Sequence, residues 1–360
     1  MSEKLVVVVN SSYPQFSRYH AREADNYAVN KGKDIGTLLP EDLKAIFAVP
    51  SLKDNSVVDH TVRGMLSFLT FKYARMMGLP ISVCDYNSSP DYLEAVFQER
   101  PKQEKNLLII PQAGSTAGDA KREATEFAKI ALNPENFLWT EAEKYTLFLW
   151  GKNTLPLPKN NQTLVILARA KSLFGLTYGD DQQLTEDSAN LTLNWMMREE
   201  GLRIGEPDLD FMSGGRVFPR GKVADTMLDP DFPGVLKAHK YSGSYTHLMI
   251  PPFKLAQRGF DVDSAEVAYL HPAIQRNLEF VGEGNQSYLE KRVLQMEVII
   301  RECAQYLGTP AAYYHMYINT LRQVVDEQLP KIEARRQLEI LLGQLQHPNP
   351  GISYPEKSSE

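Results

Sequence analysis

The chain has 360 residues, of which 43% are hydrophobic and 23% charged, and its formal net charge is -6. These values are ordinary for a folded globular protein with two or three domain-sized units, and they argue against a disordered or fibrous chain. The mild acidity disfavours a protein that coats nucleic acid or an anionic membrane surface.

The two cysteines, Cys84 and Cys303, are too few for a disulfide framework or a four-cysteine zinc site, and no two histidines have metal-ligand spacing. The sequence therefore predicts no metal or other cofactor. The apolar run at residues 5–9 is too short for a signal-peptide core or a membrane span. We expect a cytoplasmic protein without a membrane span, although export by a route that needs no signal peptide would leave no trace here.

Short β-branched or apolar runs alternate with segments of helical periodicity along the first half of the chain. This alternation predicts an α/β fold with a mixed, mainly parallel sheet flanked by helices. The expected strands lie at 5–9, 81–86, 107–110, 145–150, 164–168 and 245–250. The expected helices lie at 58–76, 118–132, 289–307, about 311–328 and 331–346.

Composition divides the chain into four parts. Residues 1–155 form an α/β sheet domain with strand-end loops, and 156–285 form a loop-rich α/β part that completes a cleft. Residues 286–346 form a helical C-terminal region, and 347–360 form a flexible tail. The best candidate for a domain boundary is 151–162, GKNTLPLPKNNQ, which is rich in Gly, Pro and Asn.

Ligands of open parallel sheets bind beyond the carboxyl ends of the strands, so the loops there are the first candidates for a site. The loop 10–36 is long and dense in charged side chains, including Glu23 and Asp25. The alternative is that this segment is a solvent-exposed surface loop without a function.

A second loop, PQAGSTAGD at 111–119, joins an expected strand to an expected helix. Its backbone amides, the hydroxyls of Ser115 and Thr116 and the positive helix end predict a phosphate site. It lacks the lysine of a nucleotide-triphosphate loop. The alternative is an ordinary tight turn, in which Gly114 and Gly118 relieve strain and one of the hydroxyls caps the helix.

A third loop, 207–231, carries five aspartates around Gly214 and Gly215. Carboxylates beside a glycine turn can activate water or hold a cation. The alternative is that these acidic side chains are ordinary solvent-exposed residues of a surface loop. Asp208 and Asp210 form an Asp-x-Asp pair of the kind that binds manganese in sugar-nucleotide transferases.

Two of these segments resemble the ADP-ribose-handling macrodomains. Residues 107–132 are similar to their late strand, phosphate turn and helix, and LVVVVNSS at 5–12 is similar to an early strand that ends in an asparagine near the distal ribose. Poly(ADP-ribose) glycohydrolases of that superfamily carry three glycines and then Gln-Glu-Glu. Here Gly214-Gly215-Arg216 is followed by Ala224-Asp225-Thr226, which leaves Asp225 as the acid.

The resemblance implies a macrodomain-like fold, with a Rossmann-like sheet as the other form of the expected α/β class. It implies an enzyme that handles ADP-ribose or a related nucleotide sugar and hydrolyses an ADP-ribosyl bond on a protein. Asp225, with Glu23 or Asp25, would activate water or protonate the leaving group. The ligand-binding residues would be Asn10, Gly114, Ser115, Thr116, Gly118, Gly214, Gly215 and Phe218.

Two other functions remain open. A metal-dependent glycosyltransferase would use Asp208 and Asp210. A non-catalytic, effector-like protein would bind its partner through the C-terminal helices.

Overall fold

The computed structural model describes residues 5–14, 55–98, 107–114, 116–202, 204, 207–230, 245–272, 286–308, 317–323 and 331–346. Three expected site residues, Glu23, Asp25 and Ser115, lie outside these ranges. The expected tail at 347–360 and most of the expected helix at 311–328 also lie outside them.

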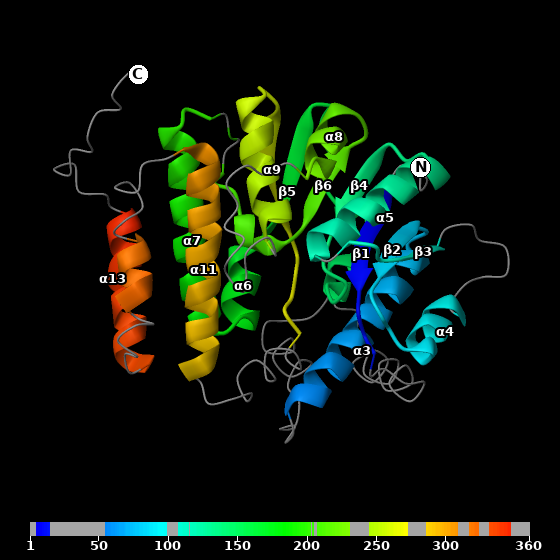
Figure 1. Cartoon of the computed structure of the whole chain (residues 1–360), viewed down its shortest axis with the longest axis horizontal. Helices are drawn as coiled ribbons and strands as arrows, with labels where there is room; N and C mark the ends of the chain where they lie inside the picture. The colour runs from blue at the N-terminus through cyan, green and yellow to red at the C-terminus, as the bar shows by residue number, and fades with distance from the viewer. Residues whose placement is uncertain are drawn as a thin grey trace.

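Within the described ranges, seven strands form one mixed sheet in the order β3-β2-β1-β4-β6-β5-β7 (Figure 1). The strands are β1 (Leu5–Ser11), β2 (Ile81–Asp85), β3 (Leu107–Pro111), β4 (Asn136–Trp139), β5 (Thr163–Arg169), β6 (Arg216–Pro219) and β7 (Asp261–Val267). All neighbours pair in parallel except β6, which is antiparallel to both β4 and β5. The α/β class and the mixed, mainly parallel sheet are therefore confirmed.

The sheet continues across the segment 151–162, because β6 joins β4 on one side of that segment in the sequence to β5 on the other.

The central strand β1 is buried on both of its faces. It pairs in parallel with β2 on one side and with β4 on the other. Val6 and Val8 contribute to one hydrophobic core, and Val7 and Val9 to a second core across the sheet. A continuous β-branched run is typical of such a strand, because helices cover both faces of the sheet.

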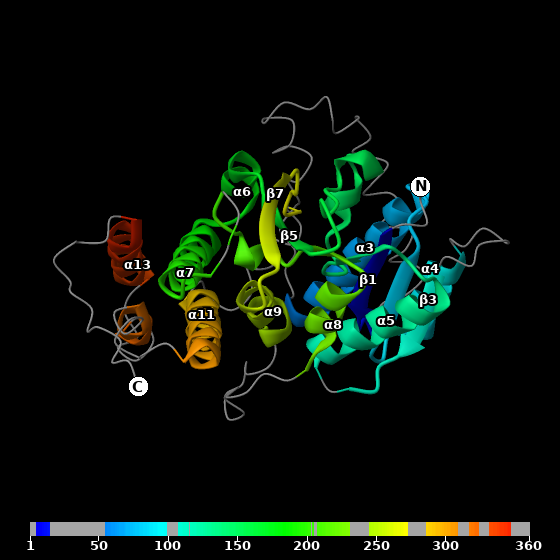
Figure 2. The ribbon, with the colours of Figure 1, turned by 90° about the horizontal axis from the view of Figure 1, so that it is seen from above.

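The helices are α3 (Asn55–Met76), α4 (Pro90–Gln98), α5 (Ala117–Ala131), α6 (Lys171–Thr177), α7 (Asp180–Glu199), α8 (Lys222–Leu228), α9 (Thr246–Gln257), α11 (Gln286–Leu307) and α13 (Lys331–Gln346). Helices α5, α8 and α9 belong to the first core, and α3 and α4 to the second. Helix α7 packs against both α11 and α13, and these three helices lie together beyond the β7 end of the sheet (Figures 1 and 2). No helix within the described ranges is both long and apolar enough to cross a bilayer.

Two of the predicted strands are wrong. Residues 245–250 begin α9, whose residues 246–256 are all buried. A helix buried on every side shows no polar face, so its periodicity is lost and a short apolar stretch of it reads as a strand. Residues 145–148 form a short 3-10 helix, η3 (Tyr145–Phe148), which is likewise buried throughout.

A buried network of charges ties α7 and α11 to the sheet. Arg169, at the end of β5, donates to both oxygens of Asp210 at 2.8 and 2.7 Å and also to Glu186 of α7. Arg292 of α11 donates to the other oxygen of Glu186. Since the side chain of Glu186 is only 4% exposed, its charge depends on these two arginines.

We predict that Arg292→Met lowers the free energy of unfolding by about 3 kcal/mol, because it leaves half of a buried carboxylate uncompensated. Urea unfolding of the wild type and the variant measures this difference. The matched control is Arg198→Met, which breaks an ion pair with Asp208 in which both side chains are 48% exposed. That loss should stay below about 1 kcal/mol. Equal effects of the two substitutions would contradict a special role for the buried network.

Candidate functional site

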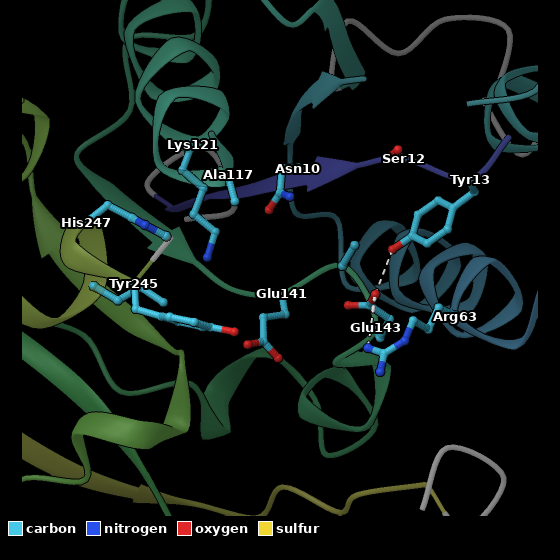
Figure 3. Close-up of a pocket in the computed structure, with 12 residues that line it drawn as sticks. Asn10, Ser12, Tyr13, Arg63, Ala117, Lys121, Glu141, Glu143, Tyr245 and His247 are labelled. Carbon is cyan, nitrogen blue, oxygen red and sulfur yellow. Dashed lines mark hydrogen bonds and ion pairs between the residues drawn. The ribbon is translucent and has the colours of Figure 1, made fainter. Parts of the chain in front are cut away.

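A pocket of about 260 Å³ lies at the carboxyl ends of β1 and β4 (Figure 3). The chain leaves β1 for β2 on one side of it and later returns to form β4 on the other side. The gap between two such strands is the topological switch point, where open α/β sheets bind ligands. Asn10, which follows the predicted strand at 5–9, lines this pocket.

The most unusual pocket residue is Lys121, one turn after the pocket residue Ala117 on α5. Its side chain is 2% exposed and extends from α5 into the cavity (Figure 3). No described residue forms a hydrogen bond or ion pair with its ammonium group. Burial lowers the pKa of Lys121 to about 8, and the charge of Glu141 only partly opposes this shift. The pocket therefore holds a buried cation without a bonded anion.

The opposite wall of the pocket is acidic and follows β4. Burial by itself would raise the pKa of Glu141. The positive charges of Lys144, whose Nζ lies 3.1 Å from Oε2 of Glu141, and of Lys121 instead lower this pKa to about 2. Glu143 accepts a hydrogen bond of 3.0 Å from the Tyr13 hydroxyl. Glu141 is thus a fixed negative charge that faces the amine across the cavity.

His247 of α9 completes the basic side of the pocket. It is 3% exposed, and neither ring nitrogen has a hydrogen-bond partner among the described residues. Burial, reinforced by the charges of Lys121, Arg122 and Arg216, holds the pKa of His247 well below its usual value, so the ring is neutral. A Cβ on Gly118 would lie 2.8 Å from the Cβ of His247, so only a glycine lets α9 approach α5 this closely.

The turn expected to bind phosphate uses its amides differently. The amides of Ala113 and Gly114 donate to the carboxylate of Glu123 at 2.9 and 2.6 Å. Thr116 and Asp119 form a reciprocal capping box at the start of α5. Of the amides expected to hold a diphosphate, those of Ala113, Gly114 and Thr116 therefore bind the protein's own carboxylates, and Thr116 has the alternative role of a helix cap.

Gly214 and Gly215 lie near the pocket, where neighbouring side chains leave little space for a Cβ on either residue. Gly214 adopts φ +76°, and a Cβ there would lie 3.2 Å from a carboxylate oxygen of Glu141. Gly215 packs against Leu167 and has equally little room for a side chain. They come to this edge of the sheet because β6 runs antiparallel and therefore begins where β4 ends.

Asp225 and Phe218, by contrast, lie away from the pocket. Asp225 is on α8 and pairs at 3.1 Å with Lys129, which lies about 12 Å along α5 from the pocket residue Lys121 at 1.5 Å per residue. Phe218 is fully buried beside Phe137 and Trp139 in the first core. The structure therefore does not bring Asp225 and Phe218 together with Asn10 at this pocket.

The Asp-x-Asp pair does not form a common metal site. Asp208 pairs with Arg198 on the surface, whereas Asp210 is bound by Arg169 and by the Asn190 amide at 2.9 Å. Among the residues that the structure describes, no cluster of three or more His, Cys, Asp or Glu side chains is placed to hold a metal ion.

Most of the pocket residues were not identified from the sequence, among them Lys121, Glu141, Glu143 and His247. Lys121 had a detectable signal, because it lies on the buried stripe of α5 beside Ala120, Ala124 and Ala128. A lysine on an otherwise small and apolar stripe is out of place unless it serves a site.

We predict that Thr116→Ala lowers the free energy of unfolding by about 1 kcal/mol, because the capping box loses one side of its reciprocal hydrogen bonds. Its affinity for nucleotide ligands should stay unchanged, since Thr116 caps α5 and does not face the pocket. Chemical denaturation and calorimetry measure the two quantities. A large loss of affinity in a stable Thr116→Ala protein would return the turn to the binding site.

We also predict that Lys121→Met stabilises the empty protein at pH 7. The pKa of Lys121 is about 8 in the folded chain and about 10.4 when unfolded, so between these values the unfolded chain binds more protons. Wild-type stability should therefore gain up to about 3 kcal/mol as pH rises through this window, and the variant should lack this gain. Urea unfolding from pH 7 to 10.5 measures it, with Lys129→Met as the control on the same helix. If the stability of wild type and of Lys121→Met changes with pH in the same way, folding does not lower the pKa of Lys121.

Comparison with known proteins leaves the pocket to be interpreted from its own geometry, because no family model, no curated protein and no solved structure matches the chain.

Proposed function

We propose that the pocket at the switch point binds ADP-ribose or a related nucleotide sugar, and that the chain hydrolyses an ADP-ribosyl bond on a protein. The observation that carries the proposal is the ionised Glu141 facing the buried amine of Lys121 across a small cavity. A ligand with an anionic end and a hydroxyl-bearing end satisfies both walls.

The topology favours the Rossmann-like form of the two expected folds. The parallel order β3-β2-β1-β4 is that of a mononucleotide-binding half, with the ligand at the ends of its central strands. The cavity is smaller than the 300–1,000 Å³ or so of pockets that enclose drug-sized ligands. It fits one sugar with its phosphate, and the rest of the nucleotide would extend through the opening.

Glu141 is suited to the chemical step because it stays negative at neutral pH. In glycosidic hydrolysis the bond from the anomeric carbon to the leaving group breaks, and positive charge develops on the sugar ring. A carboxylate beside that carbon stabilises the charge while the oxygen of water attacks. Water supplies one proton, which ends on the leaving group. Asn10, at the end of β1, would bind a ribose hydroxyl.

We predict that Glu141→Gln slows the release of ADP-ribose from ADP-ribosylated protein by about 10²–10⁴-fold, because the neutral amide cannot stabilise the developing charge. The variant keeps the shape of the side chain, so the fold should be retained. The measurement is the rate of ADP-ribose release by the full chain. Glu126→Gln, on the half-exposed face of α5, is the matched control and should keep the wild-type rate.

Two results would overturn the proposed function. One is wild-type protein that releases no ADP-ribose and gives no heat of binding with ADP-ribose at millimolar concentration. The other is Glu141→Gln protein that is as active as wild type.

A further inference from the structure

We propose that the phosphate attached to the ribose of the ligand binds at the start of α5, between Lys121, His247 and the first two amides of the helix. This inference rests on the proposed function for the identity of the ligand, but the subsite itself can be tested without any hydrolysis. Within the expected turn 111–119, it moves the anion from the amides of Ala113, Gly114 and Thr116 to those of Ala117 and Gly118. The first three amides already donate to the carboxylates of Glu123 and Asp119.

The first argument is the missing partner of Lys121. A buried ammonium needs an anion to offset its desolvation, and buried lysines are nearly always paired. The carboxylate of Glu141 belongs to the opposite wall and forms its ion pair with Lys144. No described side chain forms an ion pair with Lys121, and its ammonium projects into a cavity large enough for an anion (Figure 3).

The second argument is the free end of α5. The Thr116 side chain accepts its hydrogen bond from the Asp119 amide, so the cap leaves the amides of Ala117 and Gly118 unused. No described residue accepts a hydrogen bond from either of them. Ala117 lines the pocket, and Lys121 follows it one turn later on the same face. The helix dipole and these amides favour an anion at the point that Lys121 reaches.

The third argument is His247, an unpartnered imidazole beside the same helix end. A neutral ring carries one N–H donor and one acceptor, and leaving both unmet inside a protein is unfavourable. A phosphate oxygen between α5 and α9 accepts the N–H without needing a charged histidine. Gly118 has no side chain, which keeps the imidazole close to the helix end.

The two walls together fix the orientation of the ligand. Glu141 and Glu143 repel a phosphate from the β4 side, and their oxygens accept hydrogen bonds from sugar hydroxyls. The phosphate therefore faces α5, and the sugar faces Glu141. The ligand class that meets both demands is a phosphorylated ribose, either alone or as part of a nucleotide sugar.

The test compares the binding of ribose 5-phosphate with that of ribose. Calorimetry measures both affinities, and phosphorus NMR follows the phosphate of ribose 5-phosphate. Wild type should bind ribose 5-phosphate at least tenfold more tightly than ribose. Lys121→Met should weaken ribose 5-phosphate binding at least tenfold and leave ribose binding unchanged. His247→Leu should weaken the binding of ribose 5-phosphate about threefold or more. Lys129→Met removes a lysine from the far end of the same helix and should bind as wild type does.

The outcomes separate this inference from the proposed function. If Lys121→Met and His247→Leu both bind ribose 5-phosphate as tightly as wild type, the phosphate subsite is overturned, even if Glu141→Gln abolishes hydrolysis. If both variants lose phosphate binding while wild type hydrolyses nothing, the subsite is supported and the hydrolase proposal fails. Lys121→Met removes a buried charge, so it should melt at or above the wild-type temperature, and its loss of binding would not reflect unfolding.

Discussion

The pairing of β1 between two parallel neighbours is the constraint on which the site depends. Because β2 and β4 flank it and helices cover both faces, residues 6–9 can only be apolar. The same arrangement makes the chain leave β1 in one direction and return on the other side. The end of β1 is therefore the point where the connections diverge, and the pocket opens there beneath the start of α5.

Two buried charge systems among the described residues contrast in how well they are satisfied. Glu186 receives hydrogen bonds from two arginines and Gln182, so the charge between the sheet and the outer helices is balanced. In the pocket, Lys121 and His247 are buried with no such partners. Groups left unsatisfied in this way reduce stability, and proteins tolerate them mainly where a ligand completes them.

The sequence predicted the parts of the sheet whose strands are long and apolar. β1, β2, β3 and β5 follow continuous apolar runs, because both faces of these strands are covered. β4 and β6 have only four residues each, and β7 has the polar sequence DVDSAEV, so none of the three carries a strong periodic pattern. The mistaken strand at 245–250 concealed α9, and with it His247.

Prediction of the site failed for related reasons. Asn10 was singled out through the resemblance of residues 5–12 to a strand that ends in an asparagine. Glu141 and Glu143 follow β4, which was not recognised. The glycines and acids of 207–231 form one loop in the sequence, but β6 separates them in space. Gly214 precedes β6 and lies beside Glu141, whereas Asp225 follows β6 and lies toward the opposite ends of these strands.

The distribution of the pocket along the chain has a consequence for its formation during synthesis. The walls come from β1, α5, the segment after β4 and the start of α9, which span residues 10 to 248. A nascent chain that has already paired β1, β2 and β3 still lacks the histidine side of the cavity until α9 emerges from the ribosome. The complete pocket can therefore form only late in translation, after residue 248 has been made.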